Sequence, residues 1–166
     1  MGAPPPAVRL AHGTADDVES CVDLWIAAVE ARDGHPAVAG TRDRCLAKFE
    51  RQHVAFIVAR DGEAVAGFGL LTVPASGAVT DPPHAAYLAL LAVAADAQGR
   101  GIGTAVLDAL IADAAAAGHA ELVLHVLTGN TAAVHLYTSR GWVPHGDPHE
   151  HPLSGEASQT YVLRQR

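Results

Sequence analysis

The sequence predicts an α/β protein in which a mixed, mostly antiparallel central sheet is flanked by helices. Two β-rich runs surround Asp61-Gly62, which indicates a hairpin of neighbouring antiparallel strands. Later in the chain, apolar strands alternate with helical patterns, as in strand–helix–strand units. The 166 residues are 49% hydrophobic and 17% charged, which is enough apolar material for one core. No internal repeat or linker interrupts them, so we expect one domain over residues 1–166.

The first part of the chain predicts a short edge strand and two helices. Residues 8–10 favour a strand, although the segment is only three residues long. Thr14 suits the N-cap of a helix, and the aspartates that follow it suit the first helical turn. Apolar residues then recur at helical spacing until Gly34-His35-Pro36, which ends the pattern. A second helix is expected over residues 41–52.

The middle of the chain carries the hairpin and the most apolar strand. Residues 54–59 and 64–73 are the two hairpin strands. Residues 74–83 are rich in turn formers and are predicted to be a loop. The continuous apolar run at 87–93 indicates a buried strand. A glycine-rich turn joins it to a helix over residues 101–117, which Gly118 closes.

The C-terminal part predicts one more strand–helix unit and a final pair of strands. Residues 121–127 form a strand, and a short helix follows from Asn130 to near Arg140. Residues 142–143 and 159–163 are the candidate last strands. The polar segment between them, which contains several His and Pro residues, is expected to be a loop.

The turn at residues 98–104, Gln-Gly-Arg-Gly-Ile-Gly-Thr, is the most informative segment. Between a strand and a helix, its free backbone N–H groups and the positive end of the helix dipole would attract a phosphate or diphosphate. Glycine permits the backbone angles and the close approach that such a guest needs. The dinucleotide fingerprint does not match because these glycines are spaced by two, and the P-loop does not match because its lysine is absent.

Two motifs together resemble the GCN5-related N-acetyltransferase (GNAT) family. Residues 98–103 resemble its acyl-CoA-binding signature, Gln/Arg-x-x-Gly-x-Gly/Ala. Residues 130–137, followed by Gly141-Trp142, resemble its Asn-x-x-Ala-x-x-Leu-Tyr…Gly-Phe/Trp segment. The motifs occur in the family's order, with one helix and one strand between them, and the resemblance covers residues 87–143. It implies the GNAT fold and direct transfer of an acetyl group from acetyl-CoA to a primary amine of a small molecule or peptide.

The resemblance also implies which residues bind the cofactor. They lie at the end of the apolar strand, in the turn and at the start of the later helix: Leu91, Ala92, Val93, Gln98, Gly99, Arg100, Gly101, Ile102, Gly103, Thr104 and Asn130. The first three would pair through their backbone with the pantetheine arm, like an added strand. Asn130 would contact the pantetheine arm, and it also suits a helix cap; the two uses are compatible.

Tyr137 is the implied acid for the CoA thiolate that leaves. A phenol is a weaker acid than a thiol, so full proton transfer is uphill by about 2 kcal/mol. Tyr137 can stabilise the developing charge by a hydrogen bond alone.

The chain departs from the family at the proton acceptor. Many members carry a glutamate two residues before the conserved Leu, and here that position is Ala89. An alkylamine has a pKa near 10.4, so deprotonating it at neutral pH costs about 4–5 kcal/mol. His84, Tyr87, His125 or a chain of waters could accept the proton, and the sequence does not choose among them. An acyl-CoA-binding regulatory module with weak catalysis is therefore the alternative function.

Composition limits the partners and the compartment. The net charge of −7 argues against nucleic acid as a partner and weakly favours a cationic acceptor. The first residues lack the pattern of a secretion signal, and no apolar run is long enough to span a membrane, so we expect a cytoplasmic protein. A homodimer would be common for the family, but nothing in the sequence fixes the oligomeric state.

The cysteines and a group of histidines are two further sets of residues that could have a function. Cys21 and Cys45 lie in predicted helices without a short-spaced motif, so we expect buried free thiols and neither a disulfide nor a metal site. His145, His149 and His151 lie among prolines without a regular frame, so no metal is expected there. A solvated loop is the simpler interpretation, and a lining of the acceptor pocket is the other.

Overall fold

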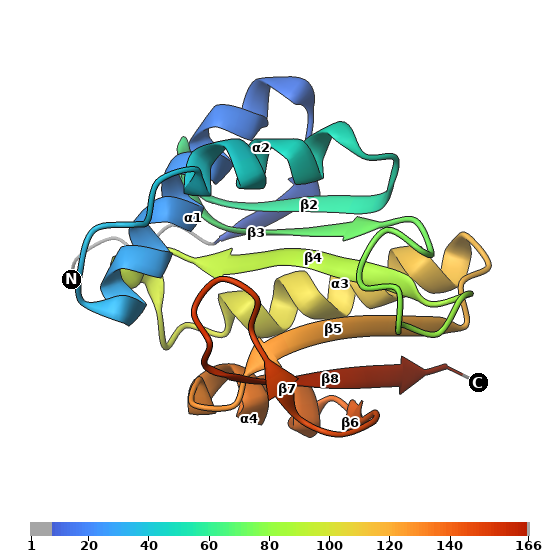
Figure 1. The fold of residues 1–166 in the computed structure, drawn as a ribbon. Coiled ribbons are helices and arrows are strands. Elements are labelled where there is room, and N and C mark those ends of the chain that lie inside the picture. The colour runs from blue at the N-terminus through green and yellow to red at the C-terminus, as the bar shows by residue number, and fades with distance from the viewer. Residues whose placement is uncertain (1–7, 166) are drawn as a thin grey trace.

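The protein, seen in a computed structural model that describes residues 8–165, is built on one mixed sheet (Figure 1). Its eight strands follow the order β1-β2-β3-β4-β5-β8-β6, and β7 pairs with β8. Every neighbouring pair is antiparallel except β4 and β5, which are parallel. The predicted α/β class with a mostly antiparallel sheet is confirmed. The start of the chain, on which the expectation about secretion depends, lies outside the described residues.

The N-terminal half of the sheet is an antiparallel run. Its strands are β1 (Arg9–His12), β2 (His53–Asp61), β3 (Ala64–Thr72) and β4 (Ala86–Val93). The predicted hairpin is present, and Gly62 in its turn has φ +63°, a conformation that favours glycine. The predicted edge strand is also present and begins one residue later than expected.

The C-terminal half of the sheet contains one strand that the sequence did not predict. The expected strands are β5 (Glu121–Leu127), β6 (Val143–Pro144) and β8 (Ala157–Arg164). The additional strand, β7 (His149–Glu150), pairs with the start of β8 inside the segment predicted to be a loop. Two residues between prolines are too few to show a β pattern in the sequence. Only their backbone pairing with a distant strand defines them as a strand.

Helices cover both faces of the sheet (Figure 1). α1 (Val18–Asp33) and α2 (Thr41–Glu50) lie on one face, and α3 (Ile102–Ala116) and α4 (Thr131–Ser139) lie on the other. All four were predicted within a few residues of these bounds. Two short 3₁₀ turns, η1 (Ala15–Asp17) and η2 (Ala95–Ala97), were not.

The entry to α1 is fixed by a polar cluster. The Asp17 carboxylate accepts a hydrogen bond from the Thr14 backbone N–H at 2.8 Å and pairs with the Arg60 guanidinium of β2. Burial opposes the charge of Asp17, but these hydrogen bonds outweigh burial and lower its pKa. The cluster therefore joins the start of α1 to the sheet.

Small residues on β3 let α3 pack closely on the sheet. A Cβ at Gly69 would lie 2.5 Å from Leu110 Cδ1, and one at Gly67 would lie 2.9 Å from Ile102 Cγ2. Both distances are too short for a side chain, so larger residues would push α3 away. Glycine at these positions places the first turn of α3 directly against β3 and β4. Within residues 8–165, no helix is long and apolar enough to cross a membrane.

Candidate active site

β4 and β5 pair only where they begin. Their register comprises Ala86 with Leu122 and Tyr87 with Val123, although β4 continues to Val93 and β5 to Leu127. The other edge of β4 stays paired with β3 as far as Val93. From Leu91 to Val93, the edge toward β5 therefore has no partner strand among the described residues. Such an edge can accept an extended molecule through backbone hydrogen bonds.

A β-bulge interrupts β4 before this edge. Leu70 pairs with Leu90 and Leu71 pairs with Leu88, so Ala89 is the extra residue. Its carbonyl oxygen accepts a hydrogen bond from Lys48 Nζ of α2 at 3.2 Å. Sequence reasoning identified Ala89 only as the position of a missing glutamate and did not find Lys48.

The glycine-rich turn has the backbone geometry that was predicted for it. Gly99 has φ +80°, and Gly101, the N-cap of α3, has φ +77°. The N–H groups of Gly101 and of residues 102–104 donate no hydrogen bond within the described part of the chain, and no side chain caps α3. The start of a helix with uncapped amides attracts an anion. No atom lies within 4 Å of where a Cβ of Gly99 or Gly101 would be, so the backbone there is open to a ligand.

The start of α4 is different because a side chain caps it. Asn130 Oδ1 accepts a hydrogen bond from the Ala133 backbone N–H at 3.3 Å. One of the two uses predicted for Asn130 is thus present. The start of α4 is therefore capped by a side chain, whereas the start of α3 is not.

Three of the segments that carry predicted cofactor residues meet in space. A Cβ at Gly103 would lie 3.5 Å from Val93 Cγ2 and 3.7 Å from Leu136 Cδ2. The end of β4, the first turn of α3 and the middle of α4 therefore meet at one place. The predicted residues are distributed over these segments and the turn between β4 and α3: Leu91, Ala92 and Val93 on β4, Gln98, Gly99, Arg100 and Gly101 in the turn, Ile102, Gly103 and Thr104 at the start of α3, and Asn130 at the N-cap of α4.

The Arg100 side chain points toward the β2–β3 hairpin. Its Nη1 lies 2.8 Å from Asp61 Oδ2, and both side chains line a small pocket of about 170 Å³ behind the turn. The ion pair is partly exposed, so it can be exchanged for another anion at little cost.

Tyr137 is buried on α4. It is 8% exposed, and its ring centroid lies 5.8 Å from that of Trp142. Burial raises the pKa of the Tyr137 phenol. Since the pKa of a thiol is near 8.5, the proton stays on the phenol oxygen. The geometry therefore favours donation of a hydrogen bond over full proton transfer.

The three protein groups that could accept a proton differ in their surroundings. His84 is exposed in the loop before β4. His125 of β5 has both ring nitrogens engaged: Nδ1 lies 2.8 Å from Thr160 Oγ1, and Nε2 lies 2.9 Å from Asp81 Oδ1, close enough for an ion pair but not aligned for a hydrogen bond. Burial raises the pKa of Tyr87, and the Asp81 charge adds to the effect. Tyr87 holds its proton and the His125 ring lies against Thr160 and Asp81, whereas the exposed His84 has no hydrogen-bond partner among the described residues.

The cysteines are buried, as predicted. Cys21 is 0% and Cys45 is 2% exposed, and neither forms a disulfide. Burial raises the pKa of Cys21 to about 12 and that of Cys45 to about 11. Both thiols therefore stay protonated at neutral pH and are poor nucleophiles.

The histidine segment lies partly over the sheet. His149 belongs to β7, and its ring centroid is 5.8 Å from that of His125. Burial lowers the pKa of His151, and the positive charge of Arg32 adds to the effect, so the segment approaches α1. No group of three His, Cys, Asp or Glu side chains in residues 8–165 is arranged to hold a metal.

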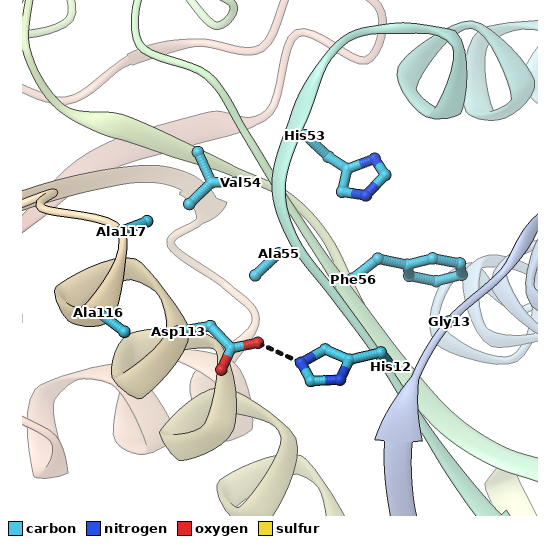
Figure 2. A pocket seen from close by; sticks show the side chains of 9 residues that line it. All are labelled: His12, Gly13, His53, Val54, Ala55, Phe56, Asp113, Ala116 and Ala117. Atoms are coloured by element: carbon cyan, nitrogen blue, oxygen red, sulfur yellow. Dashed lines mark hydrogen bonds and ion pairs between the residues drawn. The ribbon is translucent and has the colours of Figure 1, made fainter.

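A larger pocket lies elsewhere. Figure 2 shows it between β2 and the end of α3, where His12 and Asp113 face each other at 2.9 Å. Its volume is about 390 Å³, and none of the predicted site residues lines it. α3 has 15 residues, so its two ends are about 20 Å apart. This pocket is therefore remote from the turn.

Three solved structures with the same fold are distant from this chain in sequence. The yncA protein of Salmonella typhimurium, solved with its cofactor acetyl-CoA, has a TM-score of 0.76 at 18% identity, covering 96% of this chain and 95% of that one. The ribosomal-protein-S18-alanine N-acetyltransferase of Escherichia coli has a TM-score of 0.74 at 20% identity, covering 95% of this chain and 94% of that one. A histone acetyltransferase HPA2-related protein of Corynebacterium glutamicum has a TM-score of 0.75 at 24% identity, covering 96% of this chain and 97% of that one.

The sequence itself decides the family. No curated protein matches it. The pattern of the Acetyltransferase (GNAT) family, however, matches residues 19–142, which is most of the chain. This match confirms the predicted family and, with it, acetyl-CoA as the cofactor. The chain belongs to the GNAT family of acetyltransferases.

Proposed function

We propose that the protein is an acetyl-CoA-dependent N-acetyltransferase that acetylates a primary amine of a small molecule or peptide by direct attack. One observation carries the proposal: the unpaired edge of β4 and the uncapped start of α3 meet at one point. An extended arm ending in a diphosphate fits both features at once. The yncA protein, which has the same fold, was solved with acetyl-CoA.

The roles of the cofactor residues follow from this fit. The backbone of Leu91, Ala92 and Val93 would pair with the pantetheine arm. The turn from Gln98 to Thr104 would hold the diphosphate through amides that have no other partner. Arg100 would exchange Asp61 for a phosphate. Acetyl-CoA supplies the activated acetyl group, and the chain supplies its position.

Direct attack is favoured because the protein offers no thiol nucleophile. Cys21 and Cys45 are buried and protonated, so an acyl-enzyme on either is disfavoured. Tyr137 would donate a hydrogen bond to the sulfur as negative charge develops there. The exposed His84 or a chain of waters would remove the proton from the amine.

A second function, acyl-CoA binding without efficient turnover, is motivated by Ala89. A site that lacks a carboxylate base could bind the cofactor and report on it. Free-thiol release from acetyl-CoA, measured with a panel of amines, separates the two. Amine-dependent release supports the enzyme; tight binding of acetyl-CoA with no release for any amine supports the binding module.

The proposal extends to the domain, the compartment and the partners of the protein. Residues 1–166 would act as one domain, because one sheet includes every described strand. The protein would act in the cytoplasm, and its partners would be small-molecule or peptide amines. The E. coli protein with this fold acetylates an alanine of a ribosomal protein, which shows that the fold suits a protein amine as well.

A further inference from the structure

Lys48 places a positive charge at the bulge of β4. Its Nζ lies 3.2 Å from the Ala89 carbonyl oxygen and 5.9 Å from the centroid of the Trp25 ring of α1. The side chain is partly buried between α1, α2 and β4. An ammonium has three N–H donors, and the Ala89 carbonyl uses one of them. The remaining donors are available to another group.

No carboxylate compensates this charge in the part of the chain that the structure describes. Arg42 of the same helix, by contrast, pairs with Glu19 and Asp23 of α1. The neighbours whose charges act on Lys48 are Cys45, Arg51 and Arg44, and the Cys45 thiol is neutral. Burial lowers the pKa of Lys48, and the two arginines lower it further. A partly buried cation without a counter-ion is costly, so it favours an anionic ligand.

The segment that follows β7 lies on the other side of Lys48. The charge of Lys48 acts on His151, as does that of Arg32, so the segment after β7 comes near α1 and α2. In Figure 1 this segment rises from β7 toward the α1 end of β4. Glu156 is the one acidic group that acts on His151 there. Arg32 in this region is compensated by Asp33, whose Oδ1 lies 2.9 Å from its Nε, whereas Lys48 forms no ion pair within residues 8–165.

We infer that the amine acceptor carries a carboxylate close to its amino group, as amino acids do, and that Lys48 binds this carboxylate. The inference rests on the proposed acetyltransferase function. Ala89 precedes Leu91 by two residues, which span about 7 Å of strand, the length of an amino-acid-sized molecule. An acceptor held at Lys48 would thus present its amine near the unpaired edge of β4. A fixed cation there also disfavours the protonated amine.

The test compares acceptors that differ only in the carboxylate. Thiol release from acetyl-CoA is measured with a series of L-amino acids and with the corresponding amino-acid amides, over a range of pH because the amines differ in pKa. The wild-type protein should prefer the acids by about 10- to 100-fold in kcat/KM, the value of one charge-assisted hydrogen bond. Lys48→Gln keeps a donor for the Ala89 carbonyl but removes the charge, and it should abolish the preference.

Two variants serve as controls. Lys48→Arg keeps the charge and should keep most of the preference. Arg9→Met removes an exposed cation from β1, which β2 and β3 separate from β4, and should leave the preference unchanged. Equal turnover of acids and amides by the wild type would overturn the inference. So would an equal loss on both acceptors in Lys48→Gln, because Lys48 would then act on the bulge alone.

The inference and the proposed function fail in different ways. If no amine releases thiol, the acetyltransferase proposal fails. Calorimetric binding of an acid against its amide, in the presence of CoA, still measures the carboxylate preference. Preference in binding without turnover supports the carboxylate site, and no preference in binding overturns it.

Discussion

Gly101 offers the most direct test of the cofactor site. Its φ of +77° lies in the left-handed region, and a Cβ there would meet no atom within 4 Å. In Gly101→Val the loss of stability therefore comes from the backbone, about 1–2 kcal/mol for a side chain in this region. The affinity for acetyl-CoA should also fall, because the turn amides shift and the valine side chain occupies the place of the ligand. Loss of one charge-assisted hydrogen bond already weakens binding by about 10- to 100-fold.

Gly118 provides the matched control at the other end of α3. It has φ +87°, and a Cβ there would also meet nothing within 4 Å. Gly118→Val should lose a similar free energy of unfolding in urea while its affinity for acetyl-CoA, measured by calorimetry, stays that of the wild type. If the two variants bound acetyl-CoA equally well, the turn would be only a connector between β4 and α3.

Three further predictions concern the chemistry and the stability of the fold. Tyr137→Phe keeps the packing on Trp142 but removes the hydroxyl, so turnover should fall by about 10²-fold with little change in affinity for acetyl-CoA; unchanged turnover would remove Tyr137 from the mechanism. The double variant Cys21→Ala, Cys45→Ala should retain amine-dependent thiol release per folded molecule, and mass spectrometry should detect no acylated wild-type thiol; an acylated cysteine would refute direct attack. The fold lowers the pKa of Asp17, so its stabilisation is present above pH 4 and is lost as pH falls through its folded pKa. Asp17→Asn should thus cost about 1–3 kcal/mol at pH 7 and less in acid, and a pH-independent difference in urea unfolding would contradict this.

Much of the fold follows from local patterns. The hairpin at Gly62 is encoded by two β-rich runs and a turn dipeptide that lie side by side in the sequence. The ends of α1 and α3 follow from glycines that adopt positive φ, at Gly34 and Gly118. These signals act over a few residues, so they can be found without knowledge of distant contacts.

Much of the candidate site depends on contacts between distant segments. Lys48 and Ala89 are 41 positions apart, and no local pattern indicates that α2 would place an ammonium on the bulge. Asp81, His125 and Thr160 come from a loop and two strands, and only their meeting shows which polar atoms lie against the imidazole. Sequence reasoning could name His125 as a base but could not see its partners.

The sequence by itself determined the order of the helices and of every described strand except β7, the glycine turn before α3 and the family, because each depends on a short segment with its own hydrogen-bonding or motif chemistry. Tertiary structure alone decided that β4 and β5 separate beyond Tyr87, that β7 joins the sheet and that Lys48 reaches β4. Strand pairing and side-chain contacts between distant segments depend on how the whole core packs, and no local stretch of residues carries that information.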